Sequence, residues 1–371
     1  MAGLSQLSAQ LKSKLAGLSS LSLGAMGGGG SAVGLSIGTS SIKIVELQKT
    51  GKVWKLLHFG MVQLPEDAIV NREIVNAISV VDSIKTLTNQ LKLKTKTVCT
   101  SISGSSMMIK RMQVEAPNPK ELRDQVFWEA EQYLPFDVSE VVMDYQSLSK
   151  SKELTHDVIF VAAKRSTVDS YMGVVTDAGL KPKIVDLDYF ALQNLYEANY
   201  APNASEAVAI VEIGAASMKM VVVHDGVPVF TKDASMGGSN LTADIQKTLN
   251  LSYSDAEALK TGGHENGLPQ EVSELMTVMS ENIAGEIKKM LELYNASSTG
   301  APVVSVLLAG GGAKLPDLSH LVEEFTSLPA QLVNPFNAIT YDPSVFTAEY
   351  ISAIAPIASV PIGLALRAGA S

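Results

Sequence analysis

Two segments, one in each half of the chain, share the same order of residue types. Residues 35–45 and 211–221 align without gaps, and both read apolar, polar, Ile, Gly, small, small, Ser, apolar, Lys, apolar, Val. The pattern predicts a strand, a tight glycine turn and a second strand in each segment. Glycine permits close backbone approach, and small neighbours leave the turn N–H groups free to point at an anion.

The turns of these two hairpins are therefore candidate phosphate-binding loops, and hairpins that faced each other would hold a polyphosphate from both sides. The alternative is a pair of ordinary β-hairpins, which we would favour for one copy but not for a matched pair. Side-chain hydroxyls of Thr39, Ser40, Ser41 and Ser217 add further donors. The candidate residues are Ser36, Gly38, Thr39, Ser40, Ser41 and Lys43 in the first hairpin, and Glu212, Gly214, Ala215, Ser217 and Lys219 in the second.

A third glycine-rich turn, Gly310, Gly311 and Gly312, lies between an apolar segment and an expected helix. Three glycines would let the backbone approach a flat ligand such as adenine or ribose. A simple tight strand–helix turn is the alternative, and alone this signal is weak.

Composition limits the possible functions. A net charge of −9 disfavours nucleic-acid binding as the main role. The single cysteine, Cys99, excludes an intramolecular disulfide and is compatible with a reducing cytoplasm. The histidines show no metal-ligand spacing. With 371 residues, two or more subdomains are expected.

The two ends of the chain differ from its body. Leucines at helical spacing in residues 1–30 are followed by a glycine run, which predicts a flexible tail or an amphipathic helix that docks on a membrane or partner. No secretory signal is visible. The apolar run 351–366 is too short and too rich in proline to span a bilayer, so we expect it to form buried core.

Several elements are expected between the hairpins. Residues 69–91 have helical periodicity through Ile74, Ile78 and Ile84. Residues 107–182 resemble an inserted subdomain, in which Asn118 caps a helix and Glu121 lies three residues after the cap. Residues 272–294 form a long helix.

This order of hairpin, insertion, second hairpin, long helix and triple glycine resembles the actin/Hsp70/sugar-kinase superfamily. Within it, the chain resembles the PilM family of type IV pilus assembly proteins over residues 33–367. FtsA and GspL are relatives with a similar insertion. The matching segments are residues 33–47, 132–137, 185–192, 211–226, 237–245, 286–294, 307–318 and 362–367.

The resemblance implies an α/β fold with two actin-like lobes (a duplicated ribonuclease H-like fold) and an inserted α/β subdomain. The expected boundaries are a tail at 1–30, a first lobe at 31–206 with an insertion at about 105–182, and a second lobe at 207–371 with a small subdomain at about 235–300. The resemblance also implies that ATP binds in the interlobe cleft, with Mg²⁺ under its phosphates.

The resemblance further implies a cytoplasmic protein at the inner face of the membrane, attached through partners. The expected partner is the N-terminal cytoplasmic peptide of PilN, and pilus motor ATPases and the platform protein are further candidates. Tyr133, Leu134 and Phe136 are candidate lining residues for the peptide. Core packing at the helix end is the favoured alternative for these three side chains.

Three positions decide whether hydrolysis is expected. The superfamily usually has Asp where this chain has Ser36, and Asp where it has Glu212, the candidate metal ligand. Loss of one carboxylate should weaken Mg²⁺ positioning. Asp188 falls at the water-positioning site, although a helix N-cap is at least as good an explanation. We therefore expect ATP binding with little or no turnover.

Three rival functions stay open. A small-molecule kinase on the same fold would need the acid that Ser36 replaces. A filament or division protein resembling FtsA would polymerise with ATP. A secretion scaffold resembling GspL usually continues into a transmembrane helix, and none is visible in this chain.

Overall fold

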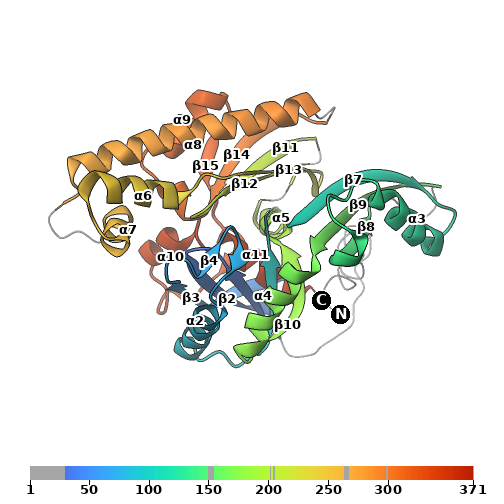
Figure 1. Ribbon diagram of the computed structural model, residues 1–371, viewed down its shortest axis with the longest axis horizontal. Coiled ribbons are helices and arrows are strands. Elements are labelled where there is room, and N and C mark those ends of the chain that lie inside the picture. Colours follow the sequence, from blue (N-terminus) through green and yellow to red (C-terminus); the bar gives the residue numbers. More distant parts are fainter. Residues whose placement is uncertain are drawn as a thin grey trace.

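The computed structural model describes residues 30–104, 106–148, 154–200, 202–203, 205–262, 267–297 and 300–370. The expected tail, residues 1–30, lies outside this range except for its last residue. The described chain forms two lobes, each built on its own mixed sheet, with a smaller unit projecting from the first lobe (Figure 1).

The first lobe contains a six-stranded sheet in the order β10-β6-β1-β2-β3-β16. Apolar residues on both faces of its central strands are buried, as expected for a sheet that helices cover on two sides. Helices α2 (Ala77–Gln90) and α4 (Arg165–Asp177) pack against each other on one face. The strands are β1 (Ser31–Ile37), β2 (Ser41–Thr50), β3 (Val53–Gln63), β6 (Thr97–Ile102), β10 (Lys181–Leu187) and β16 (Ile339–Thr340).

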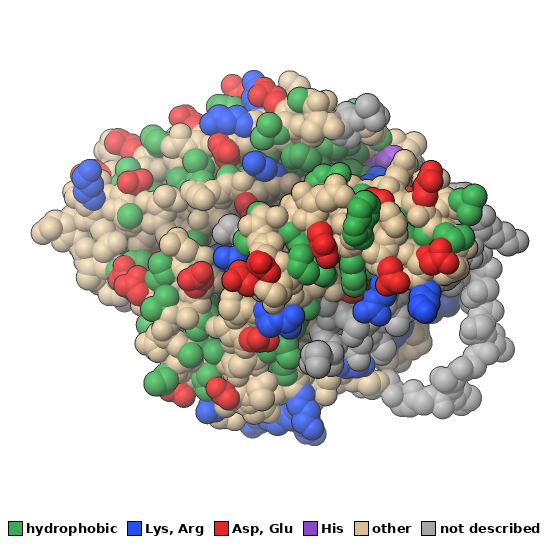
Figure 2. Space-filling model, turned by 45° about the vertical axis from the view of Figure 1, so that its right-hand side comes forward, with side chains coloured by type: hydrophobic (Ala, Val, Ile, Leu, Met, Phe, Trp, Pro, Cys, Tyr) green, Lys and Arg blue, Asp and Glu red, His purple; other side chains and the backbone are tan. Residues whose placement is uncertain are grey.

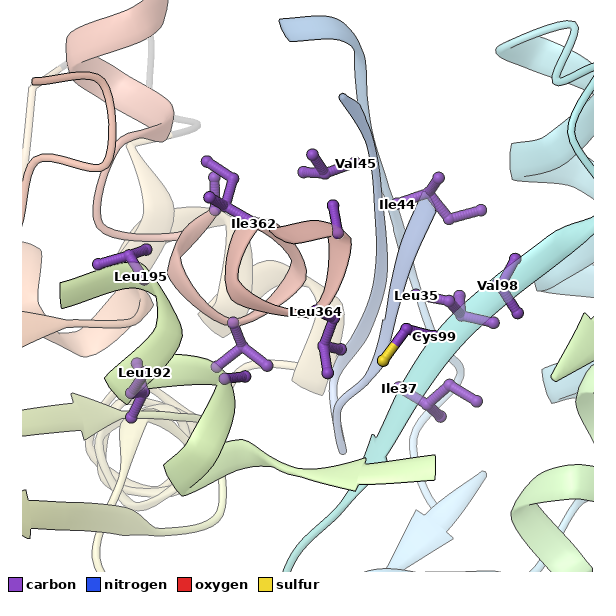
Figure 3. Close-up of a cluster of buried hydrophobic side chains, with 14 of the residues drawn as sticks. Leu35, Ile37, Ile44, Val45, Val98, Cys99, Leu192, Leu195, Ile362 and Leu364 are labelled. Carbon is purple, nitrogen blue, oxygen red and sulfur yellow. The ribbon is translucent and has the colours of Figure 1, made fainter. Parts of the chain in front are cut away.

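Two helices, α5 (Asp188–Asn199) and α11 (Ser359–Gly369), cover the other face of this sheet. Figure 3 shows Ile362 and Leu364 of α11 between the strands that carry Leu35 and Val45 and the helix that carries Leu192. Because α11 is buried on every side, its sequence is almost continuously apolar.

The second lobe contains a five-stranded sheet in the order β13-β12-β11-β14-β15. One long helix, α8 (Gln270–Ser297), and α9 (Leu318–Thr326) lie along its outer side (Figure 1). The strands are β11 (Ala207–Ile213), β12 (Met218–His224), β13 (Val227–Ala234), β14 (Val303–Ala309) and β15 (Ala330–Leu332), and helices α6 (Gly238–Leu249) and α7 (Tyr253–Thr261) complete the lobe. The small subdomain expected at 235–300 has no core of its own, because its buried side chains join those of this sheet.

The inserted unit is a three-stranded sheet, β7-β9-β8, with one helix on it. Its elements are β7 (Met107–Glu115), α3 (Pro119–Glu131), β8 (Val141–Ser147) and β9 (Thr155–Lys164). The predicted cap is confirmed, since Asn118 accepts hydrogen bonds from the backbone N–H groups of Lys120 and Glu121. The expected end at 182 is too late: α4 shares the core of the first lobe, so the insertion ends with β9.

Two other expectations were wrong. The helix expected over 69–91 begins only at Ala77, and the residues before it form the short hairpin β4 (Ile69–Val70) and β5 (Glu73–Ile74). The second lobe does not extend to residue 371, because β16 and α11 return to the first sheet. An apolar helix buried on all sides carries no signal for the lobe that it joins.

No single helix within the described residues is long and apolar enough to cross a membrane; α10 (Ala348–Ile354) and α11 reach that length and hydropathy only when they are taken together across a 93° bend. Acidic and basic side chains are interspersed on the face shown in Figure 2, and the described atoms there form no continuous basic surface.

Candidate functional site

The two predicted hairpins have the same geometry. In β1–β2, Ser36 lies opposite Lys43, and in β11–β12, Glu212 lies opposite Lys219. Their turns close with equivalent hydrogen bonds: the N–H of Gly38 donates to the carbonyl of Ser41 at 3.0 Å, and the N–H of Gly214 donates to that of Ser217 at 2.9 Å. The sequence repeat is therefore a structural repeat.

Both turns line one cleft between the lobes, and the space there, including its open mouth, measures about 550 Å³. All eleven residues predicted for the two hairpins lie on this cleft, as does Asp188. Its other lining residues are Ile37, Arg72, Ser103, Tyr171, Ala216 and Val360.

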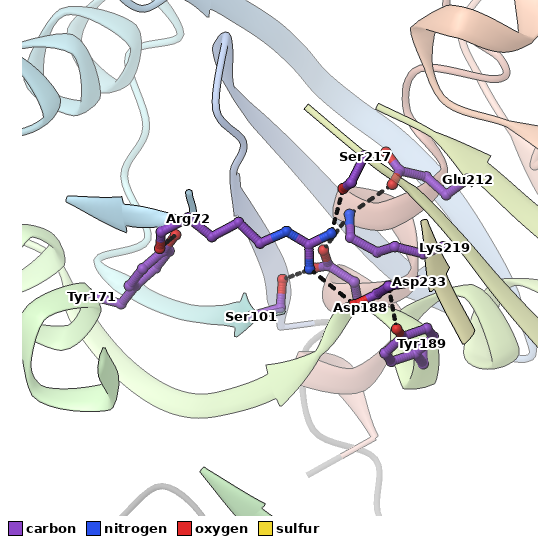
Figure 4. Close-up of polar contacts among 9 residues, drawn as sticks. All are labelled: Arg72, Ser101, Tyr171, Asp188, Tyr189, Glu212, Ser217, Lys219 and Asp233. Carbon is purple, nitrogen blue, oxygen red and sulfur yellow. Dashed lines mark hydrogen bonds and ion pairs between the residues drawn. The ribbon is translucent and has the colours of Figure 1, made fainter. Parts of the chain in front are cut away.

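Lys219 is the centre of an ion-pair network in the cleft (Figure 4). Its Nζ lies 2.7 Å from Glu212 Oε2 and 3.0 Å from Asp188 Oδ2. Burial would lower the pKa of Lys219, but the two carboxylates raise it above its ordinary value. Lys219 is therefore a fixed cation that neutralises acids from both lobes.

Asp188 is held as an anion. Burial would raise the pKa of Asp188, but the charge of Lys219 and a 2.6 Å hydrogen bond from the Ser101 hydroxyl outweigh it and hold that pKa below its ordinary value. The alternative role as helix N-cap is wrong, because Leu187 is the capping position and Asp188 is the first residue of α5. A low-pKa carboxylate already paired with a lysine is a weak general base.

Lys43 differs from its counterpart Lys219. Its ammonium donates to Ser41 Oγ at 2.9 Å, and in the part of the chain described no carboxylate lies within ion-pair distance of it. Burial lowers the pKa of Lys43, while the charge of Glu212 acts in the opposite direction. The cleft thus contains one lysine that is available to an anion.

Arg72 was missed by the sequence interpretation, because residue 72 fell within the expected helix. It occupies the turn between β4 and β5, and its guanidinium reaches across the cleft to Ser217 and to Asp233, whose Oδ2 lies 3.4 Å away. A local signal existed: asparagine precedes it, and asparagine tolerates the left-handed conformation that Asn71 adopts at φ 50°.

The triple glycine does not line this cleft. A Cβ atom at Gly310 would lie 2.8 Å from the carbonyl carbon of Ile213, and Gly312 also packs on Ile213. These two glycines therefore let the turn after β14 approach the end of β11, next to the turn of the second hairpin. Only Gly311 faces open space, so it is the one residue of the three that could meet a ligand without displacing protein atoms.

The residues present suit a polyphosphate better than a hydrated Mg²⁺ ion. Turn N–H groups, hydroxyls and Lys43 match an anion. Glu212, the expected metal ligand, is paired with Lys219, and Ser36 offers no charge. Within the described residues, no three metal-ligating side chains converge. The donor set therefore does not fit the metal that this fold usually holds.

The predicted partner residues lie in the segment that directly follows α3 in the inserted unit. Tyr133 is 50% exposed, and Lys110 Nζ lies 2.9 Å from its ring centroid. Phe136 is half-buried under Lys164, and Leu134 packs against the core of the unit. Trp128, on α3 itself, is 60% exposed and was not among the residues predicted from the sequence.

Comparisons with known proteins agree with this architecture. A solved PilM–PilN type IV pilus biogenesis complex contains a chain that is 26% identical, with a TM-score of 0.78, over 92% of this chain and 98% of that one. The ethanolamine utilization protein EutJ of Carboxydothermus hydrogenoformans is 16% identical, with a TM-score of 0.55, over 98% of this chain and 99% of that one, which supports the fold alone.

The division protein FtsA of Enterococcus hirae is 27% identical over 150 residues, which are 34% of this chain and 33% of that protein. The chain thus aligns with about a third of the length of this curated relative. The family model described as type IV pilus assembly protein PilM matches residues 34–369. The chain has an α/β actin-like fold and belongs to the PilM family of type IV pilus assembly proteins.

Proposed function

We propose that this protein is an ATP-binding adaptor of type IV pilus assembly, in which nucleotide-dependent lobe closure sets the affinity for a membrane-protein partner. The observation that carries the proposal is the pair of equivalent glycine hairpins on one interlobe cleft. Backbone donors from two lobes that converge on one space are suited to an extended anion.

The family and the surface of the inserted unit support the adaptor role. The related structure is described as a PilM–PilN complex, and we propose that this chain binds the N-terminal cytoplasmic peptide of PilN. Exposed aromatic side chains, such as Trp128 and Tyr133, are suited to peptide recognition. Such binding would hold the protein at the cytoplasmic face of the inner membrane, where motor ATPases and the platform protein are further candidate partners.

Slow or absent hydrolysis is part of the proposal. When bound, Mg²⁺ would neutralise charge on the phosphates in phosphoryl transfer. Here Ser36 supplies no acid, and Asp188 is an ionised, lysine-paired side chain rather than a group near neutral pKa. These residues favour a nucleotide sensor over an ATPase.

The test is calorimetric titration of the purified full chain with ATP, with and without Mg²⁺. We expect binding in both conditions, and Lys43→Ala should weaken it by about tenfold or more because a charge-assisted contact is lost. Lys55→Ala is the control, since Lys55 is exposed and pairs with Asp342 away from the cleft. Absence of ATP binding by the unmodified chain would overturn the proposal.

A second candidate function is an ATP-dependent filament, favoured by the partial similarity to FtsA. Sedimentation with ATP distinguishes the two. A filament protein would pellet at micromolar concentration, whereas the adaptor should stay in the supernatant and bind the PilN peptide.

A further inference from the structure

Arg72 has an unusual backbone position. It is the second residue of the two-residue turn between β4 and β5, and both turn residues have positive φ, 50° for Asn71 and 67° for Arg72. Such turns favour glycine, so arginine there is held against its conformational preference. The Tyr171 hydroxyl donates to the Arg72 carbonyl at 3.1 Å and fixes this backbone.

The surrounding residues also leave space for the Arg72 side chain to extend into the cleft. A Cβ atom at residue 104 would lie 2.5 Å from Arg72 Cδ, so Gly104 leaves the space through which the side chain passes. The Arg72 side chain is only 14% exposed. Figure 4 shows it extended from the first lobe toward the second hairpin. A surface arginine would need neither the strained turn nor the glycine.

The guanidinium ends beside the phosphate loop of the second lobe. It donates to the hydroxyl of Ser217, the last residue of that turn, and makes a 3.4 Å contact with Asp233. Asp233 also accepts a hydrogen bond from Tyr189, so it is shared between two donors. A neutral hydroxyl and a long contact to a shared carboxylate are weak partners for a guanidinium that can bind an anion through two parallel N–H groups.

The charged groups around the cleft leave Arg72 able to bind an anionic ligand. Lys219 is paired with Glu212 and Asp188, whereas within the described residues Lys43 has no carboxylate at ion-pair distance and Arg72 has one, at 3.4 Å, which Tyr189 also engages. Lys43 approaches the cleft from β2 and Arg72 from the β4–β5 turn, both in the first lobe. Two such cations can supply the positive charge that a divalent metal would otherwise supply to a polyphosphate.

We propose that Arg72 is a phosphate ligand that leaves Ser217 and Asp233 to bind the terminal phosphate of a nucleoside triphosphate. This inference rests on the proposed function and goes beyond it. It assigns a direct ligand to an element outside both hairpins, and it makes triphosphate binding independent of metal. Because the diphosphate lacks the terminal group, Arg72 distinguishes ATP from ADP.

The test uses the full chain, with ATP and ADP titrated in EDTA. Arg72→Ala should weaken ATP binding by about ten- to a hundredfold and ADP binding much less. Arg72→Lys should restore only part of the affinity, because lysine lacks the bidentate geometry. Arg111→Ala removes an arginine from the inserted unit, where it pairs with Asp157, and should change neither affinity.

Asp233→Asn distinguishes an Arg72 that binds phosphate from an Arg72 that only joins the two lobes. If Arg72 exchanges partners, removing the competing charge should strengthen ATP binding in the unmodified chain and have no such effect in the Arg72→Ala background. If Arg72 only joins the lobes, both single changes should alter ATP affinity in the same direction. Tyr189→Phe is the control, because it removes the other hydrogen bond to Asp233 and keeps the charge of that carboxylate.

The outcomes distinguish the two proposals. No ATP binding by the unmodified chain contradicts the proposed function. ATP binding that Arg72→Ala leaves unchanged, or weakens equally for ATP and ADP, contradicts the role of Arg72 alone. Circular dichroism melting of each variant shows whether it is folded, and the Arg72→Lys result stands if the alanine variant is not.

Discussion

Glu212 and Lys219 face each other across the second hairpin and form a 2.7 Å ion pair, whereas the equivalent pair in the first hairpin is Ser36 and Lys43. The two hairpins are otherwise equivalent in register and turn hydrogen bonding. Replacement of one acid by serine therefore leaves one lysine without its cross-strand partner. This asymmetry converts a symmetric pair of loops into a site with a free cation on one side.

Ser36→Asp should remove this asymmetry between the two hairpins. The new carboxylate would lie opposite Lys43 and pair with it, as Glu212 pairs with Lys219, so ATP affinity in EDTA should fall by about tenfold. Mg²⁺ should then restore part of the affinity, because carboxylate oxygen is a preferred ligand of that ion. Calorimetry with and without Mg²⁺ measures both effects.

Ser36→Ala is the matched control for that experiment. It removes the hydroxyl without adding charge, so its ATP affinity should stay independent of Mg²⁺. Equal affinities of the aspartate variant with and without Mg²⁺ would contradict the idea that Ser36 accounts for a lost metal site.

Gly237→Ala should destabilise the second hairpin. A Cβ atom at residue 237 would lie 2.6 Å from the carbonyl oxygen of Gly214, in a place where the first turn of α6 docks on the loop. Overpacking of this kind costs about 1–3 kcal/mol, and displacement of the loop should also weaken ATP binding. Urea unfolding and calorimetry measure the two effects.

Gly311→Ala is the control for this steric effect, because a Cβ atom there meets no atom within 4 Å. Its free energy of unfolding should stay within about 0.5 kcal/mol of the unmodified value. A loss of stability as large as that of the Gly237→Ala variant would show that helix or turn propensity, rather than contact with Gly214, is responsible.

The hairpins could be predicted because their signals are local. Gly38 and Gly214 mark the turns, alternating apolar residues mark the strands, and the repeat of both patterns raises their significance. Asn118 and Glu121 likewise form a capping pattern within four residues of chain. Such features depend on neighbours in sequence and not on the rest of the fold.

The remaining site could not be predicted, because it depends on distant contacts. The pairing of Asp188 with Lys219 joins two lobes, and nothing near either residue indicates it. Ile74 was assigned to the same apolar helix face as Ile78 and Ile84, which concealed the β4–β5 turn that carries Arg72. The close approach of Gly310 to Ile213 explains a glycine that was expected to meet a ligand.

A buried acid in the inserted unit should make stability depend on pH. Burial raises the pKa of Asp144 to about 7, although a backbone hydrogen bond from Tyr145 and the charge of Arg123 oppose the shift. Because the folded pKa lies above the unfolded one, the contribution of Asp144 to stability is greatest in acid. It is lost as pH rises from about 4 to 7.

Asp144→Asn should remove this dependence. At pH 8 the variant should be more stable than the unmodified chain, by an amount on the order of 2–4 kcal/mol, whereas near pH 4 the two should be similar. Urea unfolding at several pH values measures the difference. Asp169→Asn, an exposed position on α4, should leave the pH profile unchanged. Parallel profiles for the Asp144→Asn variant and the unmodified chain would contradict the assignment.

Phe136→Asp should reduce binding of the PilN peptide. Phe136 is half-buried beside Lys164 at the end of the inserted unit, and a carboxylate there would remove apolar surface and pair with that lysine instead. We expect a loss of at least about tenfold in affinity, measured by fluorescence anisotropy of a labelled peptide.

Ile78→Asp is the matched control for this change. Ile78 is 76% exposed on α2 of the first lobe. The substitution therefore replaces an apolar side chain by the same acid, but away from the inserted unit. Its peptide affinity should equal that of the unmodified chain. If the Phe136→Asp variant bound the peptide normally while melting at an unchanged temperature, the end of α3 would not be the docking surface, and Phe136 would serve only to pack the helix end.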